Sequence, residues 1–120
     1  MINQFEVSAY MVDKIPEIQT ELRNTYPTLN IFRTIQCLVN HTRQKLEQHD
    51  IPAVQKCFVV AEHIYCRGNT SVKNAIENVF IYSFPTILNM GSEDEKRQLQ
   101  SHMPLHLYTA YVLQVLKPSA

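Results

Sequence analysis

The sequence predicts an all-α fold, either an irregular bundle of five or six helices or a short α-solenoid, built on a central αα-hairpin. Three observations support this prediction. Apolar residues recur at helical spacing through most of the chain. The runs of β-favouring residues at 58–60 and 79–82 lie inside longer helical repeats, and only short turns separate the helices. Because there is no linker or low-complexity segment, residues 1–120 are expected to form one domain.

An amphipathic but interrupted helical segment is expected over residues 7–26, with Ser8 capping a short first turn. The residue before a proline is pushed out of the helical conformation, so the segment should end at Tyr26-Pro27. The next helix is expected over residues 31–49. Asn30 should begin it, because its side-chain oxygen can accept from a free N–H of the first turn.

The central hairpin consists of two apolar helices, expected over residues 51–67 and 70–89. Asp50 is the predicted N-cap of the first helix. Gly68, one of only two glycines, lies in the turn. We predict a positive φ for it at the helix C-cap, because that conformation is cheap only for glycine.

Pro85 should disturb the second helix of the hairpin. It cannot donate to the carbonyl of Ile81, and its ring crowds that carbonyl, so a kink or break is expected near residues 82–84. A short polar helix should follow over 93–103, with Ser92 and Glu95 at the spacing of a capping box.

The last helix is expected over residues 105–116. We predict that its apolar residues are buried: Leu105, Tyr108, Tyr111, Val112, Val115 and Leu116.

The charge balance limits the possible partners. The chain has 11 Lys plus Arg and 11 Asp plus Glu, so its formal net charge is zero. A nucleic-acid-binding protein usually carries a basic excess, so nucleic acid is not an expected partner. No apolar run is long enough for a bilayer, no signal peptide is recognisable, and three cysteines do not suggest a disulfide framework. We therefore expect a cytoplasmic protein that does not bind membranes.

The sequence shows no catalytic motif. A chain with two glycines has no Gly-rich phosphate loop, and the carboxylates at 93–95 are explained by helix capping. Cys37 and His41 are spaced like a nucleophile and its base, but nothing else in the sequence indicates a reactive thiol. We predict that the protein is not an enzyme and has no catalytic residues.

Histidines and cysteines recur at one-turn spacing, but the sequence does not predict a metal or another cofactor. His102 and His106 are interrupted by a proline, and no Cys-x-x-Cys pair is present. Cys57 lies on an apolar stripe, as a structural cysteine does. A small-molecule or metal-binding module remains the alternative function. Its candidate ligands are Cys37, His41, His63, Cys66, His102 and His106.

The two hairpin helices carry more apolar residues than one buried face requires. The extra residues, Val59, Val60, Ile81 and Tyr82, are the candidate protein interface. A twofold dimer through the back of the hairpin is one way to cover them.

Residues 58–88 resemble a family of small bacterial helical proteins without an assigned function. The resemblance is carried by Tyr65-Cys66-Arg67-Gly68-Asn69 and by Val72, Asn74, Ile76, Glu77 and Phe80. That family looks like helical proteins found near contact-dependent toxin systems, which would imply a binding or immunity role and provides no catalytic residues. Pro85 departs from the pattern. We therefore expect a non-enzymatic module that binds another protein, and the resemblance implies that this partner is a toxin.

Overall fold

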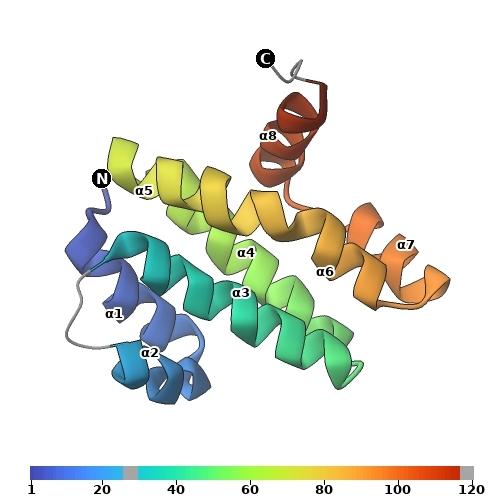
Figure 1. The fold of residues 1–120 in the computed structure, drawn as a ribbon, viewed down its shortest axis with the longest axis horizontal. Coiled ribbons are helices and arrows are strands. Elements are labelled where there is room, and N and C mark those ends of the chain that lie inside the picture. The colour runs from blue at the N-terminus through green and yellow to red at the C-terminus, as the bar shows by residue number, and fades with distance from the viewer. Residues whose placement is uncertain (26–29, 117–120) are drawn as a thin grey trace.

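The chain folds into an all-α bundle, shown in Figure 1. This computed structural model describes residues 1–25 and 30–116. Within those ranges there is no strand, and the only β-type pairing is an isolated bridge between Ile2 and Gly68. The predicted fold class is confirmed. Helices α3 (Ile31–Glu47), α4 (Ile51–Arg67) and the run from α5 to α6 lie side by side in the middle of the molecule.

The N-terminal part consists of α1 (Gln4–Lys14), the 3₁₀ turn η1 (Pro16–Ile18) and α2 (Gln19–Thr25). The prediction that Ser8 caps this region is wrong. Asn3 is the cap: its side chain accepts from the N–H groups of Phe5 and Glu6, and Glu6 completes a capping box. The segment is interrupted, as predicted, because η1 separates α1 from α2; its predicted end at Tyr26-Pro27 lies outside the described residues.

Helix α3 begins as predicted, because the Asn30 side chain accepts from the N–H of Phe32 at 2.9 Å. It ends earlier than predicted, at Glu47, in a turn where His49 has φ 59°. The N–H of His49 donates to Leu46, and that of the next residue donates to Lys45. These two bonds form a Schellman motif, with histidine in the position that glycine usually takes.

Helix α4 begins at the predicted Asp50 cap, which accepts from the N–H of Ala53 at 3.3 Å. It ends at Gly68, but the predicted positive φ is wrong: Gly68 has φ −71° and ψ 151°. Its neighbour Arg67 accepts from the N–H of Ile2 at 2.7 Å, so the N-terminal strand-like segment pairs with this turn. The turn is extended because it pairs with distant backbone.

The second hairpin helix is a continuous helical run of four parts: α5 (Thr70–Ala75), the π-helical turn η2 (Ile76–Phe80), the 3₁₀ turn η3 (Ile81–Ser83) and α6 (Phe84–Met90). The disturbance expected near 82–84 is present as the 3₁₀ turn η3 just before Pro85, where regular α-helical hydrogen bonding gives way to 3₁₀ bonding without a break in the helical run. The hydroxyl of Ser83 donates to the carbonyl of Val79 at 2.7 Å in this stretch.

Two further helices complete the chain, α7 (Glu93–Ser101) and α8 (Leu105–Leu116). The predicted capping box at Ser92 and Glu95 is confirmed. The prediction that α8 buries its large apolar residues is wrong for four of them, because the helix turns a different side toward the bundle. The exposed residues are Leu105, Tyr108, Val115 and Leu116.

The core is centred on three phenylalanines from the hairpin. The ring of Phe58 lies 5.9 Å from that of Phe80 and 5.4 Å from that of Phe84, measured between centroids. All three side chains are buried, and such aromatic contacts add to the stabilisation from burial alone. They fix α4 against the run from η2 to α6.

Among the described helices, none combines the length and the apolar character that crossing a membrane requires.

Candidate functional site

Helix α8 is held to the bundle by its inner side. Leu107 is buried, and the ring of Tyr111 lies 5.6 Å from that of Phe84, measured between centroids. Farther along, the side-chain amide of Gln114 donates to the backbone carbonyl of Glu77 at 2.9 Å. These contacts place α8 against α4 and η3, while the rest of the helix stands away from the bundle in Figure 1.

The opposite side of α8 is also apolar, and most of it is left uncovered by the described residues. We call this surface the α8 outer face; it consists of Leu105, Tyr108, Val112, Val115 and Leu116. Val112 is partly buried, whereas the other four are 69%, 50%, 63% and 71% exposed, in chain order. Its spacing of three and four residues is that of a helix–helix contact. From 105 to 116 the helix contains no Asp, Glu, Lys or Arg.

The α8 outer face continues onto a groove beside the 3₁₀ turn. The groove extends the apolar surface across two elements that the hairpin and α8 bring together. It is lined by Ile81, Tyr82, Pro85, Tyr111, Gln114 and Val115.

The four residues predicted as an interface do not form one surface. Val60 and Ile81 are buried within the chain, whereas Val59 is 60% exposed and Tyr82 is 76% exposed. The buried pair is unavailable to a partner, because α4, which carries Val60, packs against α3 and α8, and η3, which contains Ile81, packs against α8. Of the two exposed residues, Tyr82 borders the groove next to α8.

The N-terminus of α8 is bound by a carboxylate of α4. Glu62 Oε1 accepts from the N–H of Leu107 at 2.9 Å, and Glu62 Oε2 accepts from the N–H of His106 at 3.0 Å. The same Oε2 lies 2.9 Å from His106 Nδ1. Cys66, one turn after Glu62, is in the same cluster: one ligand atom from each of the three residues lies within 4.8 Å of the others. The structure thus brings together two of the candidate ligands, Cys66 and His106.

Two residues of the hairpin motif meet below α8. The hydroxyl of Tyr65 donates to Glu77 Oε2 at 2.6 Å. Burial and, secondly, this hydrogen bond raise the pKa of Tyr65 to about 12, so the phenol keeps its proton. This bond joins α4 to η2, so we assign it a structural role.

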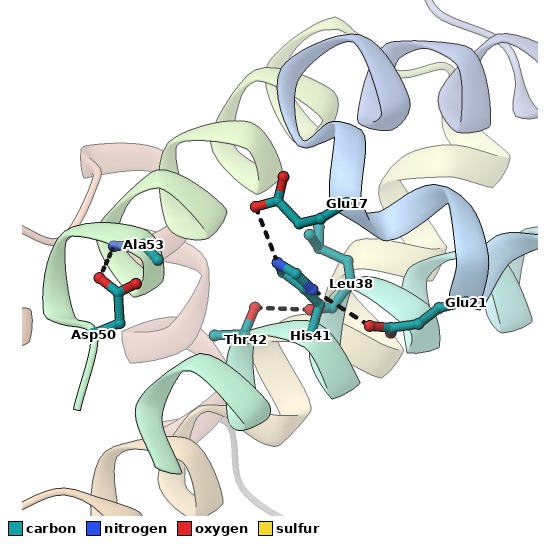
Figure 2. Close-up of polar contacts among 7 residues, drawn as sticks. All are labelled: Glu17, Glu21, Leu38, His41, Thr42, Asp50 and Ala53. Atoms are coloured by element: carbon teal, nitrogen blue, oxygen red, sulfur yellow. Dashed lines mark hydrogen bonds and ion pairs between the residues drawn. The ribbon is translucent and has the colours of Figure 1, made fainter. Parts of the chain in front are cut away.

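His41 is a buried histidine between two carboxylates, as Figure 2 shows. Its Nδ1 lies 3.3 Å from Glu21 Oε1, and its Nε2 lies 3.8 Å from Glu17 Oε1. Cys37, also buried, has its Sγ 3.9 Å from the backbone carbonyl of Glu21. These contacts fasten α3 to η1 and α2.

Three further residues, Cys57, His63 and His102, do not belong to the cluster of Glu62, Cys66 and His106. Burial raises the pKa of the Cys57 thiol to about 11, against a hydrogen bond with Thr42 that lowers it, so this thiol is not a reactive nucleophile. His63 stacks on Tyr10 with ring centroids 4.7 Å apart. His102 is exposed at the end of α7 and does not approach the His106 cluster.

In a comparison with protein families, residues 8–117 match a family model. The matching family is described as a domain of unknown function, DUF7674. The chain belongs to this family. No curated protein and no solved structure matches the chain. The family assignment agrees with the resemblance to a helical family of unknown function, while its bacterial origin and toxin association remain part of the proposal below.

Sequence reasoning did not identify Glu62 or the outer face of α8 in this DUF7674 domain. Glu62 has no local sequence signal of its role, because that role depends on a contact with α8, which is distant in sequence. The outer face had a visible signal: a helix without charged residues must be either covered on all sides or left with an exposed apolar side.

Proposed function

We propose that this domain is a protein-binding module and that the α8 outer face, with Tyr82 beside it, is its contact surface. The observation that carries the proposal is an apolar helix side of which four residues are at least half exposed. Contiguous exposed apolar surface, as opposed to scattered apolar residues, is characteristic of an interaction site.

The shape and chemistry of the face favour a protein over a small molecule. Small ligands bind in concave pockets, whereas α8 is a ridge that stands away from the bundle. An uncharged ridge with alternating spacings of three and four residues fits against an amphipathic helix or in an apolar groove of a partner. Burying it would not require the desolvation of any charged side chain of α8.

The proposed partner is another polypeptide in the cytoplasm. The resemblance of the hairpin to toxin-associated helical proteins supports a toxin-neutralising role, in which the α8 outer face would cover an apolar site on the toxin. The zero net charge supports recognition through apolar contact more than through a strongly charged patch.

Capture from native lysate with three tagged proteins tests the proposal. The double variant Tyr108→Ser, Val115→Ser removes the centre of the face, and it should fold normally because both side chains are at least half exposed. The matched control is Phe5→Ser on α1, which removes a side chain that is 62% exposed and does not belong to the α8 outer face.

We expect the wild type and Phe5→Ser to retain the same partner. The double variant should retain at least about tenfold less of that partner, since central interface residues carry most of the binding energy. Equal retention by all three proteins, with unchanged circular dichroism, would show that the α8 outer face is not the contact surface.

A further inference from the structure

A cluster of three different metal-ligand groups lies where α8 meets α4. Glu62 and Cys66 are four residues apart on α4, so both project from the same side of that helix. His106 comes from the first turn of α8. A carboxylate oxygen, a sulfur and a ring nitrogen from these residues lie within 4.8 Å of one another.

We propose that Glu62, Cys66 and His106 bind one Zn²⁺ ion, which fastens α8 to α4. Zinc accepts oxygen, sulfur and nitrogen ligands together, and three protein ligands leave its fourth position to a water molecule. This site is separate from the α8 outer face, so it goes beyond the proposed protein-binding function.

Helix capping explains only part of the cluster. The two oxygens of Glu62 accept from the N–H groups of His106 and Leu107, as a carboxylate at a helix N-terminus does. Capping requires neither the imidazole of His106 beside that carboxylate nor the thiol of Cys66. The zinc site gives a role to all three side chains.

The distances in the cluster require only small movements. His106 Nδ1 is 2.9 Å from Glu62 Oε2, and a tetrahedral zinc bound to both atoms would hold them roughly 3.3 Å apart. Cys66 and His106 are exposed, so their side chains can rotate toward the ion. Glu62 Oε1 can keep its hydrogen bond with Leu107.

The proton balance of binding is simple. Glu62 accepts hydrogen bonds as a carboxylate, so Nδ1 of His106 carries the proton that lies between them; when Nδ1 binds the metal, the ring carries its proton on Nε2. Burial, and after it the negative charge of Glu62, raises the pKa of the Cys66 thiol. The thiol therefore loses its proton to solvent as the zinc–sulfur bond forms, and binding releases one proton per chain.

Cobalt titration of the purified, metal-free full chain tests the site directly, without any partner protein. Co²⁺ is the probe because it takes the same ligands as zinc and has visible absorption. We expect one Co²⁺ per chain, with the strong visible bands of four-coordinate cobalt and a near-ultraviolet thiolate-to-cobalt band. One equivalent of Zn²⁺ should remove both signals, because zinc binds such sites more tightly than cobalt.

Three variants assign the ligands. Cys66→Ser should abolish the thiolate-to-cobalt band, and His106→Gln should weaken binding about tenfold or more, as loss of a ligand does. His102→Gln is the matched control, since His102 is an equally accessible histidine outside the cluster.

A second measurement, of thermal stability, tests whether the metal fastens α8 to α4. Zn²⁺ should raise the melting temperature of the wild type and of His102→Gln, but not that of Cys66→Ser. The proposal is overturned if the wild type gives no thiolate-to-cobalt band, if Cys66→Ser keeps the band, or if His102→Gln lowers affinity as much as His106→Gln.

Discussion

Gly68 leaves no room for a side chain in the turn between α4 and α5. A Cβ at this position would lie 2.5 Å from Val72 Cγ1 and 2.7 Å from the carbonyl oxygen of Ile64. Real Cβ atoms do not approach other atoms this closely, and one of the two obstacles is backbone. The glycine is therefore required by close packing, since its φ of −71° is available to any residue.

The Gly68→Ala variant tests this steric account. We expect it to lower the free energy of unfolding by about 1–3 kcal/mol, the usual cost of inserting a methyl group into a packed site. Urea unfolding followed by circular dichroism measures it. Gly91→Ala is the control, because its Cβ would come no closer than 3.2 Å to another atom, and that atom belongs to the Glu95 side chain. If the two variants were destabilised equally, the packing explanation of Gly68 would be wrong.

Gly68 also shows how far local sequence can predict a residue's role. The sequence identified the turn and its glycine, because both follow from residues nearby. The reason for the glycine was mispredicted, because Ile2 pairs with the backbone on both sides of Gly68. The N–H of Ile2 donates to the carbonyl of Arg67, and the N–H of Asn69 donates to the carbonyl of Ile2. A pairing between distant segments leaves no signal in either segment alone.

At the scale of elements, the turn between α3 and α4 contains the one positive φ found among non-glycine residues in the described part of the chain. His49 adopts it at the C-terminal end of α3, and its Nδ1 lies 2.9 Å from Glu95 Oε2 at the start of α7. The backbone N–H of Ser92 and, next, His49 lower the pKa of Glu95. The histidine thus combines an unfavourable backbone conformation with a contact to another helix.

Two substitutions at His49 separate these contributions. Both His49→Gly and His49→Ala remove the imidazole, but only glycine adopts this φ without strain. We expect the glycine variant to be more stable than the alanine variant by about 1 kcal/mol in urea unfolding. An alanine variant of equal or greater stability would show that the turn does not keep its left-handed conformation in solution.

Helix ends were easier to predict than helix orientation. Asn30, Asp50 and Ser92 cap their helices as predicted, because capping depends on a side chain and the N–H groups two or three residues later. The orientation of α8 was mispredicted, because its apolar residues occupy both sides and periodicity does not decide which side is buried. Its contacts with Phe84 and with Glu62 decide that, and both are distant in sequence.

At the scale of the whole molecule, the bundle encloses its core and leaves the α8 outer face exposed. A single chain has a Cα radius of gyration of 13.7 Å and encloses Val60 and Ile81, which were expected to be available to a partner. Most of the apolar surface of the hairpin is therefore buried within the chain. The central claim of this account is that the surface left for a partner is the α8 outer face.

Site-specific photo-crosslinking in expressing cells tests that claim most directly. A benzophenone side chain replaces Tyr108 on the α8 outer face or, as the control, Phe5 on α1. We predict that position 108 forms a covalent adduct with one polypeptide and that position 5 forms none; an adduct of twice the 14.0 kDa chain mass would identify the partner as a second copy. No adduct from position 108, or the same adducts from both positions, would contradict the claim.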